Sequence, residues 1–166
     1  QTFGHRYNSD GSNTYTQFTV TVDTKTSTHI YNGTGSSNGY LLNASVAPFI
    51  DLKVGNTYRF DQADASNSGH PLLFYYDAGK TTAYSTGVTT NGTPGSSGAY
   101  TQIVVSETTP NILYYQCSSH GYMGSRIDID SSTNVIDTST AFVDTTGTTI
   151  NIATTNFAIA QAVALG

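Results

Sequence analysis

Short runs in which apolar and polar residues alternate recur along most of the chain. Between residues 17 and 23, for example, Phe18, Val20 and Val22 alternate with polar residues, which is the period-two pattern of a half-buried strand. Turn-forming Gly, Asn and Pro residues separate such runs. We predict strands over residues 17–23, 40–42, 49–54, 57–62, 71–76, 100–105, 112–117 and 126–130. Short strands at this spacing are typical of a β-sandwich.

The segments between these strands carry further predictions. Gly55-Asn56 separates two predicted strands by two residues, which predicts a tight β-hairpin. Residues 84–99 contain Asn-Gly and Pro-Gly pairs and are predicted to form a long loop. Residues 29–31 are expected to form a short extended segment.

The pattern divides the chain into three parts. Residues 1–16 form a polar, turn-rich segment, residues 17–130 form the sandwich, and residues 131–166 form a C-terminal extension. The extension is first rich in Ser, Thr and Asp and then becomes apolar. Two interpretations of it stay open: an additional edge strand, or a connector to a neighbouring subunit.

Composition supports an all-β class. Charged residues make up 10% of the chain, against about 25% in typical globular proteins, and Thr and Ser take many of the polar positions. Such a chain is poor in helix formers and rich in residues that favour strands. The polar surface is expected to suit an extracellular or virion location. A chain that starts at Gln1 without an initiator Met is expected to be processed or excised.

Charge and hydropathy exclude two classes of partner. The net charge is −5, and the six Lys and Arg residues are scattered, so no basic stripe is present to bind nucleic acid. No run of 18 apolar residues occurs, and no membrane span is predicted. One cysteine cannot form an intradomain disulfide.

The segment Cys117-Ser-Ser-His120-Gly-Tyr-Met123 contains the only cysteine and the only methionine of the chain. Thiolate, imidazole and thioether ligands in one loop suit a soft metal that changes its charge by one electron, copper above all. His70, before the predicted strand at 71–76, is the candidate for a second imidazole. Zinc is the less favoured metal because Met is a poor zinc ligand. Retention of these residues for packing alone is the alternative.

The His70-Pro-Leu-Leu-Phe strand and the Cys117–Met123 loop resemble those of the cupredoxins, the small blue copper proteins. The resemblance implies a Greek-key β-sandwich with a type 1 copper site formed by His70, Cys117 and His120, with Met123 as a weak axial ligand. Two departures concern residues next to the ligands: Pro71 stands where electron-transfer cupredoxins commonly carry Asn, and Ser118-Ser119 where many carry a Pro.

A narrower resemblance covers roughly residues 17–127. It is to the cupredoxin-like domains of structural proteins of tailed phages of marine bacteria. The stretches that carry it are 31–37, 58–62, 66–71, 87–95 and 115–120. This resemblance implies a structural protein of a virion or fibre.

Two functions are therefore expected. The first is a structural or assembly protein, extracellular or in a virion, that associates with copies of itself or with other subunits through residues 131–166. The alternative is a soluble electron-transfer protein. An enzyme is not expected, because the chain has no His-x-His pair, no nucleophile elbow and a single glutamate, Glu107.

The other titratable residues are assigned no site. His5 and His29 are expected to be exposed. Asp61, Asp64 and Asp77 flank the His70 strand but lack the close alternating spacing of a calcium loop. They are expected to be solvated loop charges.

Overall fold

The computed structural model describes residues 4–7, 13–131, 142–143 and 149–150, and the side chains of residues 15–131. The chain divides into two units, Gln1–Ser131 and Ser132–Gly166. In the second unit, β13 (Phe142–Val143) and β14 (Thr149–Ile150) form an antiparallel pair. The other residues of the predicted C-terminal extension, apart from Ser131, lie outside the described residues.

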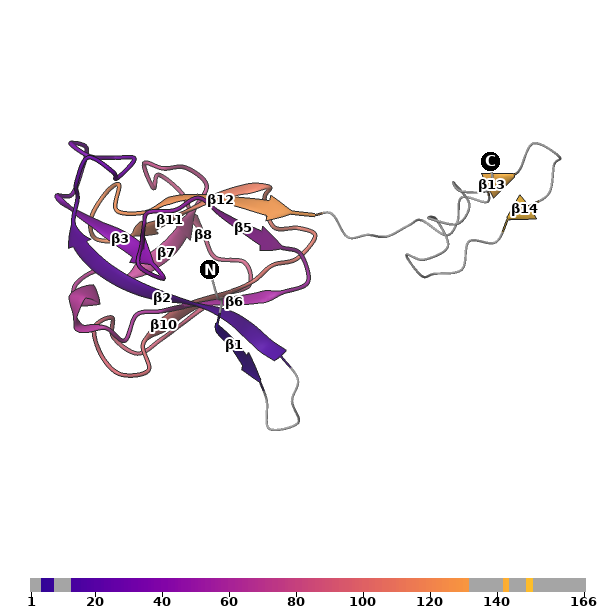
Figure 1. Ribbon diagram of the computed structural model, residues 1–166, viewed down its shortest axis with the longest axis horizontal. Helices are drawn as coiled ribbons and strands as arrows, with labels where there is room; N and C mark the ends of the chain where they lie inside the picture. Colours follow the sequence, from indigo (N-terminus) through magenta and orange to yellow (C-terminus); the bar gives the residue numbers. More distant parts are fainter. Residues whose placement is uncertain (1–3, 8–12, 132–141, 144–148, 151–166) are drawn as a thin grey trace. The chain divides into compact units, whose positions relative to one another are not determined.

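The first unit contains two sheets (Figure 1). The first has the strand order β4-β3-β2-β6-β10-β9, and β1 also pairs with β2. Its strands are β1 (Gly4–Tyr7), β2 (Asn13–Thr24), β3 (Asn38–Leu42), β4 (Ser45–Val46), β6 (Thr57–Asp61), β9 (Val88–Asn91) and β10 (Tyr100–Val104). The second sheet has the order β5-β12-β11-β7-β8. Its strands are β5 (Ile50–Lys53), β7 (Leu72–Tyr75), β8 (Ala83–Tyr84), β11 (Ile112–Cys117) and β12 (Ser125–Asp130).

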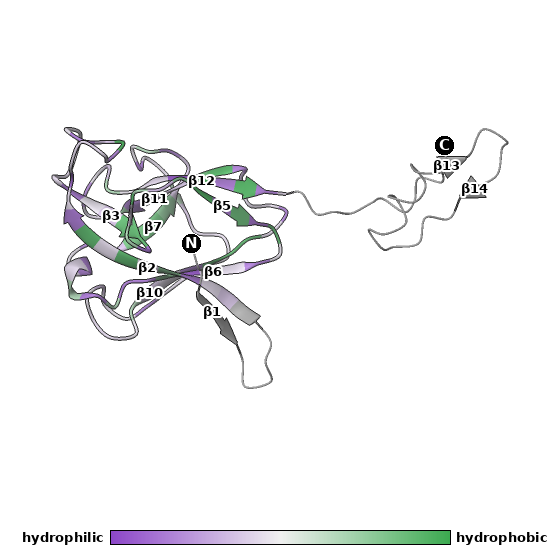
Figure 2. Cartoon of the chain, in the orientation of Figure 1, coloured by the Kyte–Doolittle hydropathy of each residue, from purple (hydrophilic) through white to green (hydrophobic). Residues whose placement is uncertain are grey.

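The core lies between these sheets, and the alternation of the sequence produces it. Inward positions in β6 and β12 alternate with partly exposed ones, and Figure 2 shows green and paler residues along the strands. Phe60 of the first sheet stacks on Phe18 at 5.0 Å and meets Phe74 of the second sheet edge-on at 5.3 Å. Burial of such a side chain contributes about 1.5–3 kcal/mol. The predicted all-β sandwich of two sheets is confirmed.

The predicted hairpin at Gly55-Asn56 is wrong. β5 pairs with β12, whereas β6 pairs with β2 and β10, so the two strands belong to different sheets. The Asn56 N–H still donates to the Lys53 carbonyl at 3.3 Å, and Gly55 has φ 85°. The turn thus connects the two sheets. Each strand buries its apolar face in the core from its own side.

Three further differences concern element limits. Residues 84–99 are not only a loop but include β9, whose residues lack a buried apolar face. β2 begins at Asn13, four residues earlier than predicted. Residues 29–31 lie in turns and bends instead of an extended segment.

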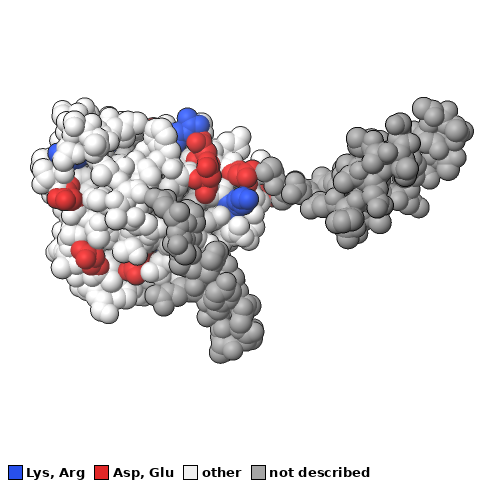
Figure 3. All heavy atoms as spheres, in the orientation of Figure 1, with Lys and Arg blue, Asp and Glu red and all other residues white. Residues whose placement is uncertain are grey.

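The surface of the first unit carries few charges. In Figure 3 the visible face is mostly uncharged, with a few acidic and basic side chains between. Among the described residues, Arg126 and Asp128 form the one ion pair. No helix in the described parts of the chain is long and apolar enough to cross a membrane.

Strand pairing brings the predicted ligands to one end of the second sheet. β7 and β11 are antiparallel neighbours in which Leu72 lies opposite Cys117. His70 precedes Leu72 by two residues, and the loop after Cys117 leads directly into β12. The start of β7, the end of β11 and the start of β12 therefore lie at the same end of the sheet.

Candidate metal centre

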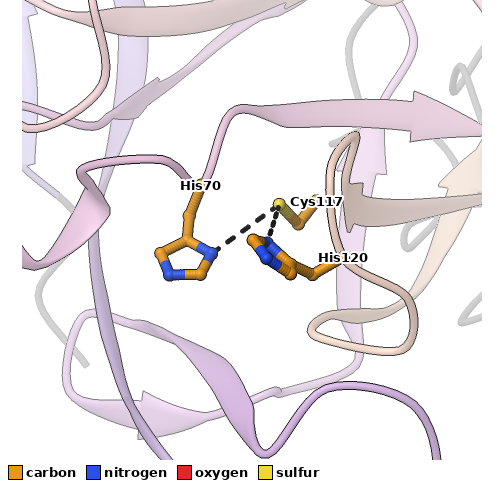
Figure 4. Close-up of side chains that lie close together, drawn as sticks. All are labelled: His70, Cys117 and His120. Atoms are coloured by element: carbon orange, nitrogen blue, oxygen red, sulfur yellow. Dashed lines mark hydrogen bonds between the residues drawn. The ribbon is translucent and has the colours of Figure 1, made fainter.

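Three of the four predicted ligand residues lie together. The Sγ atom of Cys117 is 3.8 Å from Nδ1 of His70 and 3.6 Å from Nδ1 of His120 (Figure 4). The centroids of the two imidazole rings are 4.7 Å apart. One ligand atom from each residue lies within 4.8 Å of the others.

These distances fit a single metal ion. With metal–sulfur and metal–nitrogen bonds of about 2.3 and 2.0 Å, a trigonal arrangement places sulfur and nitrogen about 3.7 Å apart. The observed separations of 3.8 and 3.6 Å lie on either side of this value. A His₂Cys set of this kind is consistent with copper.

Burial differs among the three residues. Cys117 is fully buried, His70 is partly buried and His120 is exposed. Loss of solvation lowers the pKa of His70, and the neighbouring His120 lowers it further. Both effects favour the neutral imidazole, which is the form that binds metals.

The backbone of His70 is held by three hydrogen bonds. Its N–H donates to the Asn67 carbonyl at 2.8 Å. Its carbonyl accepts from the Tyr40 hydroxyl and from Nε2 of Gln62, both at 2.8 Å. Burial raises the pKa of Tyr40 well above its ordinary value, and the adjacent Cys117 adds to this effect. The Tyr40 phenol therefore stays a neutral donor.

Gln62 joins the two sheets beside the centre. Its side chain is 1% exposed, and besides the His70 carbonyl it binds Oδ1 of Asn67 at 3.1 Å and the N–H of Leu72 at 2.9 Å. Asn67 is also buried and donates to the Val20 carbonyl at 2.8 Å. Buried polar groups that are paired in this way fix a single arrangement of the backbone.

The loop after β11 is fixed at its start by Pro71 and Lys80. The N–H of Ser118 donates to the Pro71 carbonyl at 2.8 Å. Nζ of Lys80 donates to the Ser118 carbonyl at 2.7 Å and to the Cys117 carbonyl at 3.2 Å. Pro71 thus contributes a backbone acceptor to the ligand loop. Lys80, from the β7–β8 turn, contributes the side-chain hydrogen bonds.

The loop is fixed at its end through Met123, the fourth predicted ligand. Met123 is fully buried, in the same apolar cluster as Cys117. Its carbonyl accepts from the Tyr40 N–H at 2.7 Å and lies 3.1 Å from Nε2 of His29. The role of the Met123 thioether as a ligand stays a prediction.

His29 is buried, with 3% of its surface exposed, and its predicted exposure is wrong. The Tyr31 N–H donates to its Nδ1 at 3.0 Å, so Nε2 carries the proton and donates to Met123. The turns around residues 26–34 bring the ring against Met123 of the ligand loop. The polar sequence around His29 gives no sign of this contact. The side chain of His5 lies outside those described.

The three aspartates near the His70 strand have local structural partners. Asp61 accepts from Nε2 of Gln17 at 2.9 Å, and Asp64 accepts from the N–H of Ser66 at the start of the 3₁₀ helix η1 (Ala65–Asn67). Asp77 accepts from the Thr81 N–H. In the described part of the chain, the one cluster of potential metal ligands is the His70, Cys117 and His120 group.

The residues that hold the site were not found from the sequence. Gln62 carried a signal, since it continues the inward-facing series of Tyr58 and Phe60 and is a polar residue at a core position. Lys80, Tyr40 and His29 carried none, because their contacts join segments far apart in the chain.

Comparisons with known proteins give structural similarities only. No protein-family model matches the chain, and no curated protein is significantly similar to it. Similar solved structures include the copper protein rusticyanin, with 12% identity over 77% of this chain and 88% of that chain and a TM-score of 0.40. Reduced rusticyanin has 11% identity, covers 77% and 89%, and has a TM-score of 0.38. Rusticyanin from Thiobacillus ferrooxidans has 11% identity, covers 77% and 87%, and has a TM-score of 0.37.

Proposed function

We propose that this chain is a blue copper protein that carries single electrons. His70, Cys117 and His120 would hold the ion in one plane, with Met123 as a weak axial ligand. The observation that supports this most strongly is the placement of the Cys117 sulfur 3.6–3.8 Å from both Nδ1 atoms. Copper held by thiolate, imidazole and thioether changes between Cu(I) and Cu(II) without a change of ligands.

The protein around the ion has two roles in this proposal. The burial of Cys117 and Met123 keeps water from the sulfur ligands. The hydrogen bonds to the backbone of His70 and Met123 keep the ligands in place in both oxidation states, which lowers the reorganisation that electron transfer requires. His120 is the exposed ligand, and its ring edge is the point at which a redox partner would approach.

The other parts of the sequence-based hypothesis remain proposals. A structural role in a virion or fibre rests on the resemblance of the stretches named above, and no contact in residues 13–131 favours it. The absence of enzymatic activity and an extracellular location are proposed from composition and motifs. Assembly through residues 131–166 likewise stays a prediction.

A spectrum tests the copper proposal. Cu(II) added to the reduced full-length protein should produce an intense visible band from the Cys117 thiolate. Cys117→Ser should abolish this band. Ser119→Ala is the control, because it changes an exposed side chain of the same loop and leaves the three clustered residues intact. A colourless wild type, or a band that survives Cys117→Ser, would contradict the proposal. Reversible one-electron voltammetry of the loaded protein then tests electron transfer.

A further inference from the structure

Lys80 lies in the turn between β7 and β8 and reaches across to the ligand loop. Its Nζ is 2.7 Å from the Ser118 carbonyl oxygen and 3.2 Å from that of Cys117. Cys117 is the last residue of β11, and Ser118 is the first residue of the loop that carries His120. One ammonium group therefore bridges two successive carbonyls at the point where the ligand strand ends.

The backbone of this turn directs the lysine to that point. Lys80 has φ 56°, a left-handed conformation that a residue with a side chain seldom adopts. The Lys80 N–H donates to the Asp77 carbonyl at 3.1 Å, and the Asp77 carboxylate accepts from the Thr81 N–H at 3.1 Å. A glycine or asparagine would suit this conformation better, and the two hydrogen bonds of the Lys80 ammonium group are what a lysine adds at this position.

The charge of Lys80 is not paired with a carboxylate in the described part of the chain. Among the residues whose side chains are described, no aspartate or glutamate lies within 4.0 Å of its ammonium group. The Asp77 carboxylate, three residues away, accepts from Thr81. Because Nζ is 3.2 Å from the carbonyl oxygen of Cys117, the dimensions of one residue place it within about 8 Å of the sulfur.

We propose that Lys80 is a positioning residue of the metal centre, which ties the start of the ligand loop and places a positive charge within about 8 Å of the Cys117 sulfur. This inference rests on the proposed copper function. A positive charge favours the oxidation state with the lower charge, so Lys80 favours Cu(I) over Cu(II) and raises the reduction potential.

Four variants of the full chain separate this role from general effects. Lys80→Met keeps the aliphatic stem and removes the ammonium group. Lys80→Arg keeps the charge and the donors. Lys80→Gly removes the side chain and relaxes the left-handed backbone. A fall in reduction potential that Lys80→Met and Lys80→Gly share is therefore caused by loss of the ammonium group and not by backbone strain. Lys53→Met makes the same charge change on β5, opposite Asp130 at the far end of β12.

The reduction potential is the main measurement. In Lys80→Met and Lys80→Gly, the affinity for Cu(I) relative to Cu(II) should fall about tenfold, which corresponds to about 59 mV. Lys80→Arg and Lys53→Met should stay close to the wild type. Equal potentials in Lys80→Met and Lys53→Met would overturn the assignment.

A second measurement needs no metal. In the metal-free protein, the amide hydrogen of Ser118, which is bonded to the Pro71 carbonyl, should exchange severalfold faster in Lys80→Met than in the wild type or Lys53→Met. Unchanged exchange would overturn the tie to the loop. A wild type that takes up no copper would refute the proposed function, and this measurement would then decide the role of Lys80 alone.

Discussion

Gln62 shows how one buried amide connects the core to the metal centre. Its oxygen accepts from the Leu72 N–H, and its nitrogen donates to Asn67 and to the His70 carbonyl. An apolar side chain of the same size would leave these groups unpaired in the interior, and each unpaired group costs about 1–3 kcal/mol. The position of His70 relative to Cys117 therefore depends on a residue that is not itself a ligand.

His29 has the same relation to Met123 at the other end of the loop. Both ring nitrogens are used, Nδ1 as an acceptor from Tyr31 and Nε2 as a donor to the Met123 carbonyl. A second proton on Nδ1 would displace the Tyr31 N–H. Burial lowers the pKa of His29, and the nearby Lys25 lowers it further, although the bond to Met123 opposes both effects.

The stability of the metal-free protein should accordingly depend on pH. The pKa values of His29 and His70 are lower in the folded state than in the unfolded chain, where histidine titrates near about 6.5. The unfolded state then binds more protons as the pH falls, and folding is opposed. The free energy of unfolding should be constant above about pH 7 and decline below about pH 6.5. Urea unfolding between pH 8 and pH 5 measures this decline.

The variant His29→Gln isolates the share that His29 contributes. It keeps a donor for Met123 but cannot be protonated, so the decline should be shallower and the share of His70 should remain. Asp64 and Asp77 do not interfere, because their pKa values are lowered and they titrate below this range. An equally steep decline in the variant would exclude His29 as a source of the pH dependence.

Sequence and structure differ most clearly at this scale. The proximity of Cys117 and His120 was predictable because chemically distinct residues occupy one short loop. His29 was not, because its partner Met123 is 94 positions away and the contact depends on how the turns between β2 and β3 fold. Lys80 was equally hidden, 37 positions before Cys117.

At the scale of elements, the junction between the ligand loop and β12 is closely packed. A Cβ atom added at Gly124 would overlap the carbonyl oxygen of Tyr115 in the neighbouring strand. The Gly124 N–H also donates to Oε1 of the buried Gln116 at 2.9 Å. Only a residue without a side chain lets β12 begin this close to β11, directly after Met123.

Gly124→Ala should therefore destabilise the fold by more than about 3 kcal/mol, since the clash is with backbone and cannot be relieved by a side-chain rotation. Gly121→Ala, in the same loop, is the matched control. Its added Cβ would have no atom within 4 Å, and a change within about 0.5 kcal/mol is expected. Thermal or urea unfolding of both variants provides the comparison, and similar stabilities would show that the junction relaxes.

Alternation predicted where most strands lie but not how they pair. It placed strands at β5 and β6 because Ile50, Leu52, Tyr58 and Phe60 face the core. The two-residue connection then suggested a hairpin, although the chain crosses between the sheets at that point. β9 escaped prediction for the opposite reason, since Val88 is its one apolar residue and the polar residues that follow it are exposed, so no alternation is produced.

For the whole molecule, the question is whether residues 1–131 form a self-sufficient unit. β12 is the last strand of this unit and lies between β5 and β11. Its buried residues Ile127 and Ile129 complete the core. The ligands, their hydrogen-bond partners and both sheets thus belong to residues that precede position 132.

A chain that ends at Ser131 should consequently keep the stability of the full chain within about 0.5 kcal/mol, together with any copper spectrum. A chain that ends at Gly124 is the contrasting case: without β12, the Leu52 and Leu113 side chains lose a central neighbour strand, and no cooperative unfolding transition is expected. A marked loss of stability in the longer fragment would show that residues 132–166 support the sandwich. Sedimentation of the same pair of full and shortened chains tests the predicted connector role, which requires an oligomer that only the full chain forms.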